Sequence, residues 1–269
     1  MNSLTKKYTK LKKTLKGLGS GIIAFSGGLD SGLLAKVARD CLGAEVIAVT
    51  ACSPTYPAGD LRKAKIIARE IGIRHLVVKT DEFKDKNFTA NSRNRCYWCK
   101  KKLFSKLRTL TSRYGSTYIM DGTNFDDRRD HRPGLIANKE YSVKSPLYEC
   151  GFTKKDVRNL AKLLKLSFWN QPSQSCLSSR IPFGQAITLS RIERIGQAER
   201  ILRNFFGNDI LLRARDHNEL VRIELEKKGW TQLVKSDINR LLKGLKKTGY
   251  TYITFDLEGY IPAGLRRQN

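Results

Sequence analysis

Residues 22–31, Ile-Ile-Ala-Phe-Ser-Gly-Gly-Leu-Asp-Ser, decide the fold of this chain. A short apolar run ends in Ser26-Gly27-Gly28, and apolar residues at helical spacing follow over 33–38. This order predicts a buried strand, a tight glycine turn and the start of a helix. The N–H groups at a helix start have no partner within the helix and lie at the positive end of its dipole, and glycines let the main chain approach an anion closely. The stretch therefore predicts a phosphate cradle.

Three polar side chains belong to this cradle. Ser26 and Ser31 add hydroxyl donors, and Asp30 is suited to hold the loop or a magnesium ion. The spacing of Gly27 and Gly32 also fits a Walker loop, but Leu33-Leu34 stands where that loop needs a lysine and a serine or threonine. The stretch instead resembles the SGGxDS motif of the PP-loop ATP pyrophosphatases, which grip the β- and γ-phosphates and leave AMP on a substrate carbonyl. A glycine turn without a ligand is the alternative.

Three more apolar runs predict strands, and helical patterns alternate with them; the runs are 45–50, 74–79 and 117–121. This alternation predicts an α/β fold, with a parallel sheet covered by helices on both faces. Ligands of such sheets bind beyond the carboxyl ends of the strands. Three loops should therefore share one rim: 26–31, 50–57 and 80–95. Main-chain groups of 51–53 are placed to read an adenine, and the polar stretch from Gly122 should form a second wall of the nucleotide site. The carboxylates over 126–130 either position Mg²⁺ or cap the adjacent helix.

The composition constrains partners and compartment. The chain has 269 residues, a formal net charge of +26 and six cysteines. Nucleic acid, nucleotides and other anionic substrates all suit this charge, and so does a lysine-rich surface with no such role. The sequence shows no signal-peptide pattern and no long apolar run, so we expect a cytoplasmic protein that does not engage a membrane. In a reducing cytosol, paired cysteines indicate metal binding or catalysis more often than disulfides.

Cys96-Tyr-Trp-Cys99 stands at a predicted helix start. Two thiolates there fit a redox pair, half of a zinc site or part of an iron–sulfur cluster, and two ligands are too few for either metal. Cys176 is a candidate third ligand; with Arg180 four residues further on, it also fits a stabilised thiolate. The remaining cysteines have no partner spacing, and we interpret them as structural or incidental: Cys41, Cys52 and Cys150.

We predict a PP-loop domain over 1–170, a linker and active-site loop over 171–187, and a small α+β domain over 188–269. The linker stretch is rich in turn-forming residues and lacks periodicity. The last domain is predicted from a helix after Thr188, strands at 210–215 and 220–225, a helix through 238–245 and a strand at 250–255.

Arg213 and Arg215 alternate along one of these strands and therefore point to the same face, with Val221 or its neighbours opposite. A pair of guanidinium groups suits bidentate binding of a phosphate or carboxylate. An exposed basic strand face is an equally weighted alternative in a chain this basic.

Taken together, these motifs resemble the LarE family of ATP-dependent sulfur transferases along nearly the whole chain. The resemblance rests on these stretches: Ser26-Gly-Gly-Leu-Asp-Ser31, Cys99-Lys100, Asp121-Gly-Thr-Asn-x-Asp-Asp127 with Arg132-Pro-Gly134, Ser145-Pro-Leu147, Cys176-Leu-x-Ser-Arg180, Ala198-Glu199 and Arg213-x-Arg215-x-His217. Gly32 departs from the family pattern, where a second small hydroxyl residue is expected.

The resemblance implies a reaction. Family members convert pyridinium-3,5-biscarboxylic acid mononucleotide, a small-molecule nucleotide, to its bis-thiocarboxylic form during synthesis of the nickel-pincer nucleotide cofactor. ATP with Mg²⁺ activates a carboxylate as its acyl-adenylate with loss of pyrophosphate, and a sulfur nucleophile displaces AMP. By the same resemblance, Ser26, Gly27, Gly28, Asp30, Ser31 and Gly122 bind ATP, and the assembly is a homo-oligomer, suggested to be a hexamer.

The sulfur source divides the family into two versions. In one, the cysteine matching Cys176 gives up its own sulfur and becomes dehydroalanine; in the other, three cysteines hold a 4Fe-4S cluster whose open iron carries an extra sulfide. Cys96, Cys99 and Cys176 fit the cluster version, so Cys176 is assigned first as a cluster ligand and second as a sacrificial nucleophile. The resemblance also places four residues on the substrate side: Arg180, Glu199, Arg213 and Arg215.

Two other functions stay open. A PP-loop tRNA thiolase combines the same motif with three cysteines and a cluster, and the charge of +26 suits RNA, although no RNA-binding module or aromatic-interleaved basic strand stands out. The other alternative is a nucleotide-binding regulatory protein with a structural cluster and no turnover.

Overall fold

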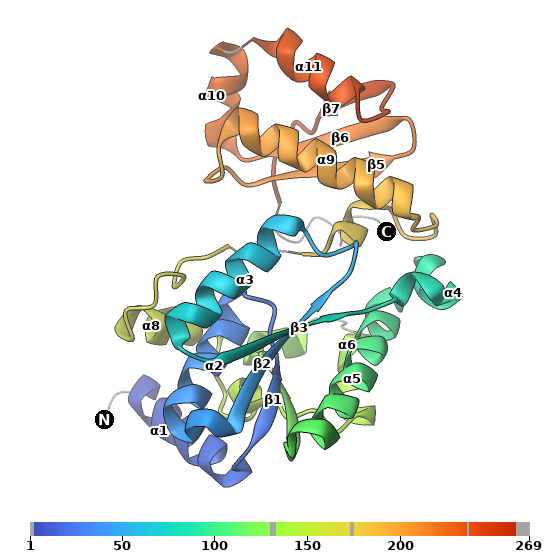
Figure 1. Cartoon of the computed structure of the whole chain (residues 1–269). Coiled ribbons are helices and arrows are strands. Elements are labelled where there is room, and N and C mark those ends of the chain that lie inside the picture. Colours follow the sequence, from blue (N-terminus) through green and yellow to red (C-terminus); the bar gives the residue numbers. More distant parts are fainter. Residues whose placement is uncertain (1–2, 130–132, 173–174, 236, 262–269) are drawn as a thin grey trace. The chain divides into compact units, whose positions relative to one another are not determined.

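A computed structural model describes residues 3–129, 133–172, 175–235 and 237–261 (Figure 1). Asp130 and Arg132 of the predicted loop and family motif lie outside these residues. The chain forms two compact units, one of residues 1–88 and 93–174 and one of residues 89–92 and 175–269. The division after residue 174 falls within the stretch 171–187, and the second unit also takes in the short segment 89–92.

The first unit is built on a parallel sheet of β1 (Gly21–Ala24), β2 (Val46–Cys52), β3 (Arg74–Lys79) and β4 (Tyr118–Asp121). The strand order is β3-β2-β1-β4, and Gly21 aligns with Val46 on one side and Tyr118 on the other. The predicted parallel α/β sheet is confirmed. Because all four strands run the same way, the loops that follow them lie at one edge of the sheet.

Helices cover both faces of this sheet, since alternate strand residues point to opposite faces. Ile23 belongs to the core formed with α1 (Ser3–Leu18), α2 (Leu29–Leu42), α3 (Ala58–Ile71) and α8 (Lys154–Leu163). Its neighbour Ile22 packs with α5 (Arg95–Tyr114) and α6 (Gly134–Glu140) on the other face. Figure 1 shows α2 and α3 on one side of the strands and α5 and α6 on the other. Five short helices complete the unit and its junction: η1 (Gly43–Glu45), η2 (Glu82–Lys84), α4 (Lys86–Thr89), η3 (Phe125–Arg129) and α7 (Pro146–Glu149).

The second unit holds η4 (Leu177–Arg180), α9 (Leu189–Phe206), β5 (Leu212–His217), β6 (Leu220–Leu225), α10 (Lys227–Lys235), α11 (Ile238–Lys246) and β7 (Tyr252–Phe255). The two strands predicted at 210–215 and 220–225 are present as β5 and β6, which pair as an antiparallel hairpin, and β7 joins β6 in parallel. The hairpin strand β5 begins and ends two residues later than predicted. Helix α10 was not predicted, because Gly229 lowers the helix propensity of a short segment.

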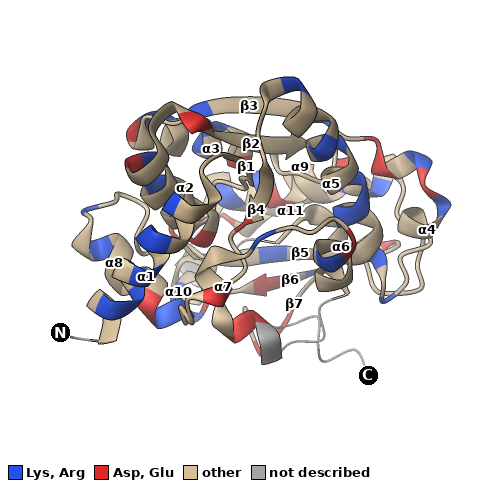
Figure 2. Cartoon of the chain, turned by 90° about the horizontal axis from the view of Figure 1, so that it is seen from below, with Lys and Arg blue, Asp and Glu red and all other residues tan. Residues whose placement is uncertain are grey.

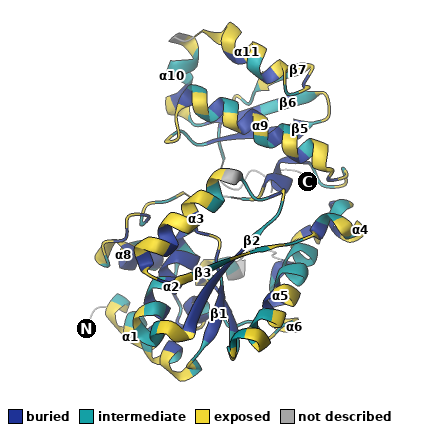
Figure 3. Cartoon of the chain, viewed as in Figure 1, coloured by how far each residue is buried: buried dark blue, intermediate teal, exposed yellow. Residues whose placement is uncertain are grey.

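The buried residues lie mainly in the two sheets and on the helix faces that pack against them. The dark strands β1 and β2 in Figure 3 lie inside the first unit, and the inner residues of α9, β5 and β6 form a separate core in the second. Lysine and arginine are spread over several helices of the first unit, among them α1, α3 and α5, rather than gathered on one element (Figure 2). Within the described part of the chain, no helix has the length and apolarity needed to cross a membrane.

Candidate active site

The loop between β1 and α2 is closed by its own hydroxyl groups. The hydroxyls of Ser26 and Ser31 lie 3.0 Å apart, the Gly28 N–H donates to Ser26 Oγ, and the Ser31 hydroxyl donates to the Gly28 carbonyl. Gly27 has a φ of +67°, and a Cβ there would lie 2.7 Å from the Cα of Ala64 in α3. Both the positive φ and this close approach require glycine. Gly28, the N-cap of α2, provides no side-chain cap, so no N-cap side chain occupies the N–H groups of the first turn.

Gly122 brings the loop after β4 against this first helical turn. A Cβ on Gly122 would lie 2.7 Å from the Ser31 nitrogen and 2.9 Å from the Ser31 Cα. Ser31 is itself buried, so a side chain at Gly122 would have to displace packed backbone of α2. The wall predicted from Gly122 therefore lies directly beside the cradle.

We expect Gly122→Ala to lower the free energy of unfolding of the first unit by about 1–3 kcal/mol, because the added methyl overpacks against α2. ATP binding should weaken at the same time, since the turn that moves carries the cradle. Thermal unfolding and calorimetric ATP binding check both effects. Gly17→Ala is the control, because a Cβ at Gly17 meets no atom within 4 Å; equal behaviour of the two variants would contradict the close approach.

Two further rim loops are tied to the cradle. The Tyr56 hydroxyl donates to the Ser26 carbonyl at 2.6 Å, and burial raises the pKa of Tyr56, so the hydroxyl keeps its proton. The hydroxyl of Thr55 donates to the buried Glu82 carboxylate after β3. The loops that begin at residues 26, 50 and 80 thus meet at one rim.

Asp30, in the middle of the motif, is held by chain groups on both oxygens. Lys154 lies 2.5 Å from Oδ2, and the Asn124 side-chain amide donates to Oδ1 at 3.2 Å. Of the two roles predicted for the neighbouring carboxylates, helix capping applies to Asp126, which accepts the backbone N–H of Lys154 at the start of α8.

A buried carboxylate connects the cradle wall to helix α5. Asp121, the last residue of β4, accepts hydrogen bonds from Lys100, Asn138, Ser145 and Thr123. Burial alone would raise the pKa of Asp121, but the Lys100 charge and these hydrogen bonds outweigh it and hold the pKa below its ordinary value. Lys100 follows Cys99 in α5, so one ion pair spans from the cysteine helix to the residue before Gly122.

The three candidate sulfur ligands lie on two elements. Cys96 and Cys99 stand one turn apart near the start of α5, with Cys96 exposed and Cys99 half-buried. Cys176 is exposed and lies in the second unit, before η4. Among the described residues, no three His, Cys, Asp or Glu side chains are grouped so as to hold a metal ion.

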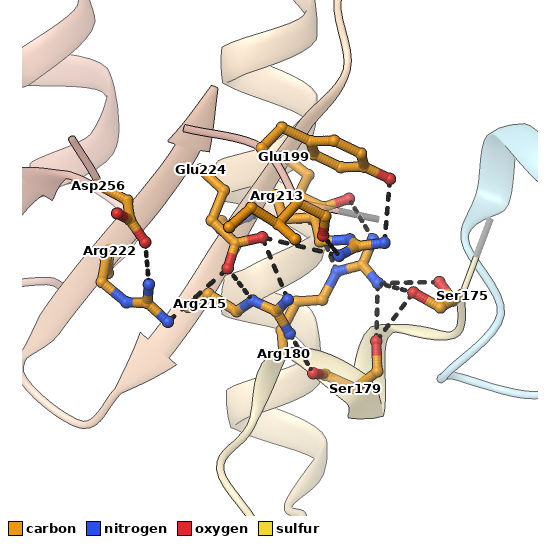
Figure 4. A network of polar contacts seen from close by, with 12 residues as sticks. Ser175, Ser179, Arg180, Glu199, Arg213, Arg215, Arg222, Glu224 and Asp256 are labelled. Carbon is orange, nitrogen blue, oxygen red and sulfur yellow. Dashed lines mark hydrogen bonds and ion pairs between the residues drawn. The ribbon is translucent and has the colours of Figure 1, made fainter. Parts of the chain in front are cut away.

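A buried arginine, Arg180, holds the loop that carries Cys176. Figure 4 shows Ser175 and Ser179 of this loop beside the Arg180 guanidinium. Nη1 of Arg180 donates to the carbonyls of Ser175 and Cys176 and to the hydroxyls of Ser175 and Ser179. The other side of the guanidinium pairs with Glu199 of α9, with 2.7 Å between Nε and Oε1. Both charged side chains are about 5% exposed. Arg180 and Glu199 therefore set the backbone that presents the Cys176 thiol.

Arg213 and Arg215 extend from β5 beside this pair. Arg215 pairs with Glu224 of β6 at 2.8 Å and donates to the Ser179 carbonyl, whereas Arg213 donates to the Tyr260 hydroxyl and the Ile261 carbonyl. Both arginines are buried, 6% and 2% exposed, so the alternative of an exposed basic strand face is wrong. The hairpin register places Arg213 opposite Glu224 and Arg215 opposite Arg222.

This cluster carries more positive than negative charge. Three buried arginines, Arg180, Arg213 and Arg215, face two buried glutamates, Glu199 and Glu224. Burial lowers the pKa of Arg213, and the charges of Arg180 and Arg215 add to this lowering, while Tyr260 and Glu224 oppose it. An added anion would relieve this repulsion, which is the electrostatic condition for a phosphate or carboxylate site.

Comparisons with known proteins identify the family. Residues 21–93, from β1 through β3 to the segment before α5, match the asparagine synthase family. The chain is 37% identical over 263 residues to the pyridinium-3,5-bisthiocarboxylic acid mononucleotide synthase of Lactiplantibacillus plantarum, a match that covers 97% of this chain and 94% of that protein. The chain belongs to the LarE family.

Two other relatives match along the whole chain. An uncharacterized protein of Synechocystis sp. is 42% identical over 265 residues, with 98% of each chain covered. An uncharacterized protein of Methanocaldococcus jannaschii is 31% identical over 258 residues, with 95% of this chain and 97% of that protein covered. The match to the Lactiplantibacillus plantarum synthase favours the LarE family over the tRNA thiolase class. Together with the PP-loop domain, it makes this chain an ATP-using enzyme.

Proposed function

We propose that this LarE-family protein is an ATP-dependent sulfur transferase of cofactor synthesis. It adenylates a carboxylate of pyridinium-3,5-biscarboxylic acid mononucleotide, releases pyrophosphate and replaces a carboxylate oxygen with sulfur. The observation that carries the proposal is the full-length relationship to a synthase of the bisthiocarboxylic mononucleotide, together with a glycine cradle at a helix start. The chemistry requires this order, because a carboxylate resists nucleophilic attack until AMP becomes its leaving group.

In this proposal the first unit activates the substrate. Gly27 and Gly28 let the polyphosphate approach the N–H groups of α2, and Ser26 and Ser31 contribute hydroxyl donors. Gly122 closes the site from the β4 side. Preorganised N–H groups at a helix start stabilise the charge of the departing pyrophosphate without reorganisation. The magnesium ion would enter with ATP and screen the phosphate charge.

The sulfur would be delivered from the cysteines. The described residues do not group three metal ligands, so the proposal of a 4Fe-4S cluster rests on the chemistry and number of the thiols. Cys96, Cys99 and Cys176 would supply three thiolates and leave one iron without a protein ligand. When bound, such a cluster would supply sulfide to the activated carboxylate. The chain's own contribution is to present the thiols: α5 holds Cys96 and Cys99 one turn apart, and the loop around Arg180 exposes Cys176. If Cys176 instead gives up its own sulfur, the same exposure serves that reaction.

The arginine cluster of the second unit would bind the anionic substrate. Its excess positive charge suits the phosphate or the second carboxylate of the mononucleotide. The planar guanidinium of Arg213 donates to Tyr260 and Ile261 and would exchange these bonds for bidentate contact with the anion. Glu199 and Glu224 hold Arg180 and Arg215 in place. Arg180, Glu199, Arg213 and Arg215 are therefore proposed as the substrate side of the site.

The experiment that tests this function follows pyrophosphate release. We expect MgATP to yield AMP and pyrophosphate only when the biscarboxylic mononucleotide is present, because adenylation needs the carboxylate as nucleophile. Nicotinic acid mononucleotide, which has one carboxylate, and transfer RNA are the comparison substrates. Release that depends on transfer RNA would instead support the thiolase, and no release with any substrate would support a protein without turnover.

A further inference from the structure

Lys154 is a charged side chain beside the cradle that no sequence motif marks. It begins α8, and its ammonium lies 2.5 Å from Asp30 Oδ2, in the first turn of α2. With Asn124 on Oδ1, both oxygens of the motif's carboxylate are held by chain groups. The carboxylate that would repel a polyphosphate is thereby neutralised by a lysine at the edge of the cradle.

The backbone of Lys154 is fixed, whereas its charged end is accessible. Its N–H donates to Asp126, and Thr153 and Asp156 form a reciprocal capping box around the start of α8. The side chain itself is 28% exposed. A lysine ammonium on a flexible stem has three donors and can pass from a carboxylate to a phosphate oxygen without movement of the helix.

The Lys154–Asp30 contact is poorly suited to a purely structural role. Both side chains are a quarter or more exposed, and ion pairs with such exposure contribute little to stability. The same contact has a clear role when nucleotide arrives, because a magnesium ion brought with ATP competes with Lys154 for the Asp30 carboxylate. An ammonium released beside the N–H groups of α2 lies where the polyphosphate would be held.

We propose that Lys154 is a nucleotide-binding residue, which pairs with Asp30 beside the cradle and binds the β- or γ-phosphate when MgATP occupies the site. The inference rests on the proposed use of ATP and assigns to α8 a part in phosphate binding. No covalent step is involved: one charge-assisted hydrogen bond to a carboxylate is exchanged for one to a phosphate.

The test measures equilibrium binding of MgATP and of AMP by calorimetry, with no carboxylate substrate present. Lys154→Met should weaken MgATP binding about tenfold to hundredfold, the range of one charge-assisted hydrogen bond. AMP, which lacks the β- and γ-phosphates, should bind with nearly unchanged affinity. Lys155→Met is the matched control, since it removes the same charge from the exposed next residue of α8 and should leave both affinities unchanged.

The double variant Asp30→Asn with Lys154→Met, titrated with ATP in EDTA so that no magnesium ion engages residue 30, separates binding from neutralisation. If Lys154 only neutralised Asp30, removing both charges would restore the binding of metal-free ATP that Lys154→Met loses, and that result would overturn the inference. Equal weakening of MgATP and AMP, or no weakening in Lys154→Met, would also overturn it. A wild type that binds MgATP through Lys154 but releases no pyrophosphate with the mononucleotide would refute the proposed function alone; a wild type that binds no ATP would refute both.

Discussion

Cys176→Ala should abolish sulfur transfer, by a factor on the order of 10³ or more, and leave substrate-dependent pyrophosphate release in place. The reason is that the two steps use residues of different units. The cradle that would activate the carboxylate lies in the first unit, and Cys176 is an exposed residue of the second. The measurement is thiocarboxylate product and pyrophosphate in one reaction. Cys41→Ala, which removes a half-buried thiol of α2, is the control and should retain both.

Iron content then distinguishes the two sulfur sources. In protein purified without oxygen, about four irons per chain in the wild type and their loss in Cys176→Ala would support the three-cysteine cluster. An iron-free wild type whose Cys176 becomes dehydroalanine after turnover would support the sacrificial route. Retention of sulfur transfer in Cys176→Ala would contradict both assignments of this cysteine.

Glu199→Ala should lower the free energy of unfolding of the second unit by about 3–5 kcal/mol, because it leaves the guanidinium of Arg180 buried without its carboxylate. Arg180 also holds the Cys176 loop through four hydrogen bonds, so sulfur transfer should fall together with stability. Chemical denaturation measures the first effect. Glu193→Ala, on the exposed side of the same helix, should change stability by no more than about 0.5 kcal/mol.

The ion pair of Arg180 and Glu199 also predicts how the stability of the second unit depends on pH. Burial opposes ionisation of Glu199, but Arg180, and after it Arg203, hold the pKa below its ordinary value. A depressed carboxyl pKa stabilises the folded state fully above the ordinary glutamate range, near pH 4, and this stabilisation is lost as the pH falls below it. Glu199→Gln should therefore reduce the loss of unfolding free energy that the wild type shows as the pH falls below about 4. An unchanged loss would contradict the stabilising role of the Arg180–Glu199 ion pair.

The first unit was predictable because its signals are local. Alternating strands and helices, the glycine turn after 22–25 and the break at Gly72 each mark an element by its own residues. Gly32 is an informative departure: a Cβ there would lie 2.6 Å from the Phe168 ring, so the family's small hydroxyl residue would not fit unless that ring moved. A contact across more than a hundred residues of sequence leaves no local signal.

The side-chain pairings of the site were less predictable for the same reason. The alternation of Arg213 and Arg215 indicated a shared face, but their burial depends on Glu224 in the next strand and on Tyr260 beyond β7. The sequence around Tyr56 predicts only a loop, and the sequence around Lys154 predicts only the start of a helix. Their roles beside the cradle follow only from the tertiary contacts with Ser26 and Asp30.

The mass of the nucleotide product tests directly whether this protein replaces carboxylate oxygen with sulfur. Anaerobic protein is incubated with MgATP, a sulfide source and pyridinium-3,5-biscarboxylic acid mononucleotide, and the nucleotide is analysed by mass spectrometry. We predict replacement of carboxylate oxygen by sulfur, dependent on ATP and accompanied by AMP. Consumption of ATP with a nucleotide of unchanged mass, under conditions in which the Lactiplantibacillus plantarum synthase forms the bisthiocarboxylic mononucleotide, would contradict the proposed sulfur transfer.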